Sequence, residues 1–173
     1  MTKMKRAVVF VFVLVIFYAL WKLFSASVAD IAWLAPGYTK LQLFLATSIA
    51  KFTVGLLQVF GFNEVFQQGR WIMMDPSNGV VITNPCLGIG LYWMFTAFII
   101  SYPGKLISKV WFLPLGLFLI FMVHVIRSAF LGFVYIYYPD IFVFSHLYIS
   151  RGFLFAMTLL FCFVWVQYIS RKK

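Results

Sequence analysis

Five long apolar runs divide this chain, and they constrain its fold more than any other feature. They cover residues 7–24, 41–62, 87–102, 110–138 and 146–170. About 20 apolar residues in a helix are enough to cross the hydrocarbon core of a bilayer. Only 10% of the residues are charged, too few to give a soluble domain a wetted surface. The sequence therefore predicts an all-α integral membrane protein, folded as one polytopic unit over residues 1–173.

Basic residues flank these runs and indicate the orientation of the chain. Eight of the 14 Lys and Arg residues form three short clusters: Lys3, Lys5 and Arg6; Lys105 and Lys109; Arg171, Lys172 and Lys173. Short loops rich in Lys and Arg remain on the cytoplasmic side of a membrane. The net charge of +10 therefore reflects topology and does not indicate a nucleic-acid-binding protein.

The run 41–62 is predicted to lie outside the bilayer core, as an interfacial or re-entrant helix. Counting it as a span would place the two basic termini on opposite sides of the membrane, against the charge rule. On a helix, Lys40, Thr47, Lys51 and Gln58 fall within about 20° of one line and form a polar stripe suited to an interface. Four spans then remain, and both termini are cytoplasmic. The spans are residues 7–24, 86–102, 110–138 and 146–170.

Two further features follow the first and second runs. Ser27-Val28-Ala29 resembles a signal-peptidase site, so cleavage of residues 7–24 as a signal peptide competes with a retained first span. Residues 67–85 predict a short extracytoplasmic β-hairpin, in which β-prone residues 71–74 and 80–83 flank a turn at 75–79. This hairpin would deliver the chain to Cys86.

Three residues that are costly to bury are predicted to meet at the outer membrane surface. Cys86 opens a span, where the free N–H groups of a helix terminus suit a thiolate. Arg127 follows Lys109, at the inner boundary, by eighteen residues, a rise of about 27 Å in a core about 30 Å thick. His146 begins the last span. A thiol, a guanidinium and an imidazole at one depth indicate thiol acyl-transfer chemistry.

Other residues complete the predicted site. Gly88 leaves the backbone open to a substrate chain. His124 shares the helix face of Arg127, and Arg151 is either a substrate anchor or an outward-facing cation. Cys162 lies deep in the last apolar run and is expected to be a buried apolar residue. No metal or organic cofactor is expected, because the ligand set for one is absent.

The order of these residues resembles the exosortase/archaeosortase family of membrane-embedded cysteine transpeptidases. The resemblance rests on the hairpin ending in Asn84-Pro85-Cys86-Leu87-Gly88, an arginine within a later span and a histidine opening the next, and it covers about residues 40–165. The short chain is similar to the compact exosortase-family proteins of Bacteroidetes. The family commonly has Asn at the position of His124 and Ser at that of Leu87.

The resemblance implies Cys86 as nucleophile, Arg127 as stabiliser of the transition state and His146 as the proton-transfer residue. The substrates would be secreted proteins with a C-terminal motif, a transmembrane helix and a basic tail, cleaved on the extracytoplasmic face of the inner membrane. An amine, lipid or glycan of the envelope, or water, would resolve the thioester. Two alternatives remain open: a membrane protease that only hydrolyses, and a non-catalytic scaffold or small transporter subunit.

Overall fold

The computed structural model describes residues 3–28, 31, 34–74 and 78–169, most of them helical. The α-helices are α1 (Lys3–Ser27), α2 (Ala35–Val59), α3 (Ile89–Ser101), α4 (Leu106–Tyr137), α5 (Phe142–Phe144) and α6 (Ser150–Val164). Two 3-10 turns are η1 (Asn84–Leu87) and η2 (Pro139–Ile141), and two π-helical turns are η3 (Ser145–Ile149) and η4 (Trp165–Ile169). The fold class predicted from the apolar runs is confirmed.

Four helical segments of the described part are long and apolar enough to cross a membrane. They are Ala35–Val59, Asn84–Ser101, Leu106–Tyr137 and Pro139–Gln167, and α1 contributes the shorter apolar piece Val15–Ser27. The protein is thus a multi-pass membrane protein. By length and composition α2 qualifies as a span, although the sequence predicts that residues 41–62 lie at the interface.

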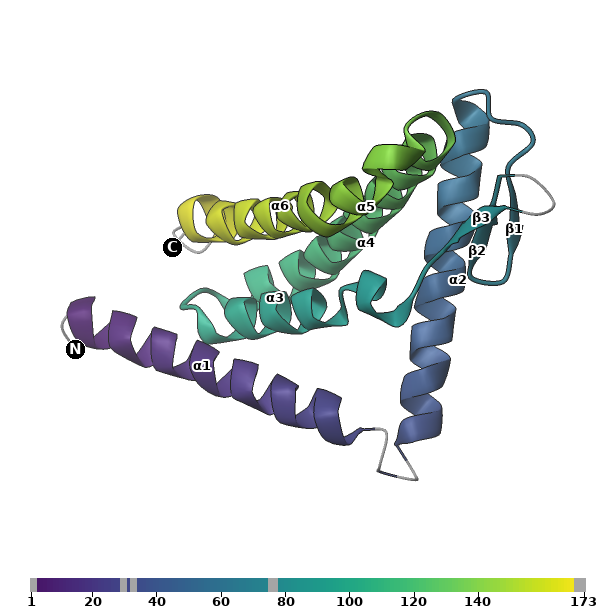
Figure 1. Ribbon diagram of the computed structural model, residues 1–173. Coiled ribbons are helices and arrows are strands. Elements are labelled where there is room, and N and C mark those ends of the chain that lie inside the picture. Colours follow the sequence, from purple (N-terminus) through teal and green to yellow (C-terminus); the bar gives the residue numbers. More distant parts are fainter. Residues whose placement is uncertain (1–2, 29–30, 32–33, 75–77, 170–173) are drawn as a thin grey trace.

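The long helices are not all aligned with one another. In Figure 1, α1, α3 and α6 extend to one side of α2, α2 runs crosswise to them, and the small sheet lies beside α2 on the other side. A helix crossing the ends of a bundle lies close to the membrane plane if the bundle spans the bilayer. The interfacial placement of residues 41–62 remains a prediction that this arrangement favours.

The sheet contains one more strand than the sequence predicts. Its strands β1 (Phe66–Gln68), β2 (Trp71–Met73) and β3 (Gly79–Val81) pair antiparallel in the order β1-β2-β3. The predicted hairpin is β2–β3, in which Ile72 pairs with Val80. Of the turn expected at 75–79, residues 75–77 lie outside the described residues. The sheet places β3, and hence the segment that follows it, against the bundle.

Two apolar clusters hold the bundle together at its two ends. One joins α2, the sheet and α4 around Ile49, Ile72 and Val125. The other joins α3, α4 and the end of α6 around Phe95, Phe112 and Trp165. The first cluster fixes the positions of β3, η1 and the C-terminal half of α4, which carry the predicted site.

Candidate active site

Cys86 lies on the 3-10 turn η1, directly after the sheet. Pro85, the second residue of this turn, suits its start because its φ is fixed and it has no N–H to leave unpaired. The Cys86 N–H donates to the carbonyl of Thr83 at 2.9 Å. Gly88 then adopts φ +63°, and α3 starts at Ile89. The helix predicted from Cys86 onward is therefore in two parts, and the turn holds the cysteine apart from the first turn of α3.

The His146 imidazole faces the Cys86 thiol. The distance from Cys86 Sγ to His146 Nε2 is 3.2 Å, within hydrogen-bonding reach for a thiol and an imidazole nitrogen. His146 lies on η3, and its ring stacks on that of Phe142 with centroids 6.1 Å apart and planes 7° apart. Within the described part of the chain, no carboxylate hydrogen-bonds to His146. Stacking on Phe142 therefore orients the ring.

Arg127 approaches Cys86 from the buried side. Its side chain is only 4% exposed. Nη1 donates to the Cys86 carbonyl at 3.5 Å, and Nη2 lies 4.0 Å from Cys86 Sγ. Among the described residues no carboxylate pairs with this guanidinium. A buried cation without a fixed counter-ion is costly, and such groups concentrate at functional sites.

A second donor to the sulfur was missed by the sequence analysis. The Thr83 hydroxyl donates to Cys86 Sγ at 3.2 Å. The signal was present in the sequence, because a threonine just before a helical turn commonly bonds a group two or three residues ahead. Thr83, His146 and Arg127 thus surround the sulfur, from the hairpin, η3 and α4 respectively.

The three predicted residues open into one cavity of about 270 Å³. Its remaining walls are the β2–β3 hairpin, α4 and Phe142, through the side chains of Ile72, Val80, Ile82, Thr83, Ser128 and Leu131. The lining is mainly apolar apart from the three reactive groups and two hydroxyls. Such a space can receive a peptide segment in extended form, with a carbonyl between the sulfur and the guanidinium.

The predicted substrate-binding residues lie in two other places. Gly88 and Arg151 line a separate cavity of about 510 Å³ between α1, the start of α3 and α6. His124 is fully buried, and a Cβ added at Gly88 would lie 2.5 Å from its Cε1 and Nε2. The His124 ring also stacks on Tyr92, with centroids 5.7 Å apart. Burial leaves His124 no surface for a substrate, so it supports the turn that carries Cys86.

Cys162 also lies as expected, far along α6 against the apolar cluster around Phe112 and Trp165. Both cysteines are free thiols. Within the part of the chain that the structure describes, no three His, Cys, Asp or Glu side chains are grouped so that they could hold a metal ion.

The sequence matches the family model for transmembrane exosortases (Exosortase_EpsH) over residues 3–165. The chain belongs to the transmembrane exosortase family. Searches among curated proteins and solved structures found no match. Membership supports, in general terms, a membrane-embedded sorting transpeptidase. In this exosortase-family protein, the thiol, guanidinium and imidazole that carry the resemblance converge from three separate elements.

Proposed function

We propose that the protein is a cysteine transpeptidase that cleaves a C-terminal sorting signal through a thioester on Cys86. The observation that supports it best is the 3.2 Å distance from Cys86 Sγ to His146 Nε2, with Arg127 Nη2 4.0 Å from the same sulfur. A nucleophile within reach of a base, with a cation beside the reacting atom, is the arrangement that covalent acyl transfer requires.

In the first half-reaction His146 accepts the proton of the Cys86 thiol, and the sulfur attacks the carbonyl carbon of the substrate. The carbonyl π electrons move to oxygen, and the Arg127 guanidinium stabilises the oxyanion. When the tetrahedral intermediate collapses, the C–N bond breaks and His146 gives its proton to the leaving amine. The products are a thioester on Cys86 and a released C-terminal segment.

The second half-reaction resolves the thioester. His146 removes a proton from the incoming amine, hydroxyl or water, whose lone pair attacks the thioester carbonyl. The C–S bond then breaks, and the thiolate recovers the proton from His146. Thr83 donates a hydrogen bond to the sulfur and so stabilises the thiolate form of Cys86.

The proposed substrates are envelope-bound proteins with a C-terminal motif, a transmembrane helix and a basic tail. The reaction would take place on the extracytoplasmic face of the inner membrane. Lys105 and Lys109, which the charge rule assigns to the cytoplasm, lie where α3 ends and α4 begins, whereas Cys86 precedes α3 and Arg127 lies in the C-terminal half of α4. The acceptor would be an amine, lipid or glycan of the envelope, or water.

The test compares a strain lacking this protein with strains carrying the wild type, Cys86→Ala or Cys86→Ser. We expect proteins with an uncleaved C-terminal helix to accumulate in the membrane fraction of both variants, as in the deletion strain. Mass spectrometry of C-terminal peptides measures this accumulation. If Cys86→Ala restores normal processing, the scaffold or transporter interpretation replaces the transpeptidase.

A further inference from the structure

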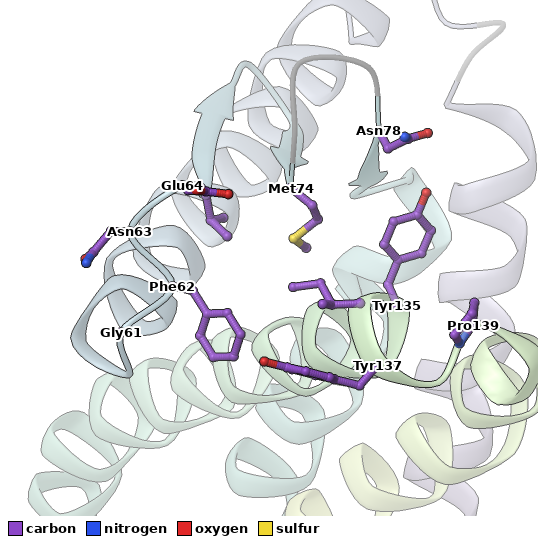
Figure 2. A pocket seen from close by; sticks show the side chains of 11 residues that line it. Gly61, Phe62, Asn63, Glu64, Met74, Asn78, Tyr135, Tyr137 and Pro139 are labelled. Atoms are coloured by element: carbon purple, nitrogen blue, oxygen red, sulfur yellow. The ribbon is translucent and has the colours of Figure 1, made fainter.

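Another cavity, of about 770 Å³, lies apart from the cysteine. It is bounded by the loop after α2, the described residues Met74 and Asn78 at the turn end of the β2–β3 hairpin, and the C-terminal end of α4 (Figure 2). Its lining residues include Phe62, Glu64, Met74, Asn78, Tyr135 and Tyr137. The mechanism uses none of them.

The lining of this cavity suits an organic cation. Glu64 supplies a carboxylate, and no described residue forms an ion pair with it. Figure 2 shows the Glu64 carboxylate, the Met74 sulfur and the rings of Phe62, Tyr135 and Tyr137 around one open space. Aromatic faces attract a cation held within about 6 Å of the ring centre. A carboxylate and three rings together make an ammonium or guanidinium the best-matched ligand.

The cavity that contains Glu64 adjoins the cavity around Cys86. Asn78 lines the first and Gly79 the second, so the hairpin separates them. Ring contacts also connect them. The ring centroids of Tyr135 and Phe142 lie 5.6 Å apart, and those of Phe142 and His146 lie 6.1 Å apart. These two steps put the Tyr135 and His146 rings no more than about 12 Å apart. An extended peptide covers that distance in about three to four residues.

We propose that this cavity binds a Lys or Arg side chain of the substrate, three to four residues from the attacked carbonyl on its amino-terminal side. The assignment rests on the proposed function, because it takes the catalytic cavity as the place of cleavage. The carboxyl-terminal side of the substrate enters the membrane, so the amino-terminal side is the one that passes over the hairpin.

A membrane lipid is the less suitable source of the cation. The amine headgroup of a phospholipid carries a phosphate beside its ammonium. No basic side chain is among the described residues that line the cavity, so this phosphate would have no partner among them. A peptide brings a cationic side chain with a neutral backbone, which needs no such partner.

Met74 provides a direct readout of occupancy, since its side chain is one of those that line the cavity (Figure 2). The full chain, labelled with methyl-¹³C methionine, is placed in phosphatidylglycerol nanodiscs, and Met74→Leu assigns the signal among the seven methionines. The probe is Nα-acetyl-lysine methylamide, and its Nε-acetylated form is the uncharged control. We expect the Met74 signal to shift with the charged probe only.

Two carboxylate variants then separate the cavity from the general surface charge. Glu64→Gln should weaken binding of the charged probe at least about tenfold. Asp140→Asn removes the same charge from an exposed carboxylate that does not line the cavity, and it should leave the affinity unchanged. Equal shifts with both probes, no shift, or unchanged affinity in Glu64→Gln would overturn the proposal.

The lipid alternative has its own outcome. A Met74 shift that appears on changing the lipid to phosphatidylethanolamine, with no response to the lysine probe, would assign the cavity to a headgroup and refute the peptide subsite. The titration is independent of catalysis, because Cys86→Ala should bind the probe as the wild type does. A failed transpeptidase test and a failed binding test are therefore distinguishable.

Discussion

Arg127 carries the strongest functional argument of any single residue, because stability alone gives no reason to bury it. Its guanidinium has no carboxylate partner among the described residues, and its contacts are the carbonyl and sulfur of Cys86. Arg127→Met should therefore leave the melting temperature in detergent unchanged or raised, since it removes an unpaired buried charge. Cleavage of the sorting signal should fall at least about 100-fold, the effect typical of losing an oxyanion donor.

Arg127→Lys is the matched control for this prediction. Lysine keeps the charge but lacks the planar fork that reaches both the carbonyl and the sulfur, so partial activity is expected. A large loss of thermal stability in Arg127→Met, with Arg127→Lys fully active, would mean that the arginine serves packing and charge only.

Thr83 offers a finer test at the same scale. Thr83→Val keeps the shape of the side chain and removes the hydroxyl that donates to Cys86 Sγ at 3.2 Å. A hydrogen bond of this kind contributes about 0.5–1.5 kcal/mol, so the rate of Cys86 alkylation by iodoacetamide should fall about two- to tenfold. Thr83→Ser, which retains the hydroxyl, should react at close to the wild-type rate. Equal alkylation rates in both variants would exclude a role for the hydroxyl.

Among the elements, the turn from η1 into α3 decides where the thiol points, and Gly88 is its critical position. An alanine there would have an unfavourable φ of +63° and a Cβ 2.5 Å from the buried His124 ring. Gly88→Ala should lower stability by about 1–3 kcal/mol and abolish processing. Gly152→Ala on α6 is the control, because its Cβ would meet no atom within 4 Å. Thermal unfolding measures the stability of both variants, and cleavage of the sorting signal measures their activity. A fully active Gly88→Ala would contradict the tight turn.

The elements around Cys86 show how much of the fold and of the site the sequence predicts. Apolar periodicity and charge placed Cys86, Arg127 and His146 at one depth, and turn residues predicted the β2–β3 hairpin. The strand β1 was missed because Phe66–Gln68 has no alternation of its own and is ordered only by pairing with β2. Stacking of Phe142 on His146 was also missed, because it depends on the π-helical turn η3. Local patterns predict elements, and depth in the membrane stays a prediction, whereas contacts between distant side chains need the packed fold.

At the scale of the whole molecule, the site depends on how the bundle is closed at one end. The hairpin, α4 and η3 each contribute one wall of the cavity around Cys86, and α2 holds the first two together through the cluster around Ile49 and Ile72. The cavity that contains Glu64 uses the same hairpin from its other side. Because both cavities share this support, the route of the proposed substrate to them depends on where α2 lies relative to the membrane.

The membrane position of α2 can be measured directly. Single cysteines replace Lys40, Lys51 or Gln58 in a chain whose two native cysteines are changed to alanine. If α2 lies at the outer interface, a membrane-impermeant maleimide added to intact spheroplasts should label all three positions at similar rates. If α2 spans the bilayer, positions near its two ends, such as Lys40 and Gln58, would be reached from opposite sides. Lys51 would then lie at depth and resist labelling. That second pattern would give five spans, and with them the two basic termini on opposite sides of the membrane.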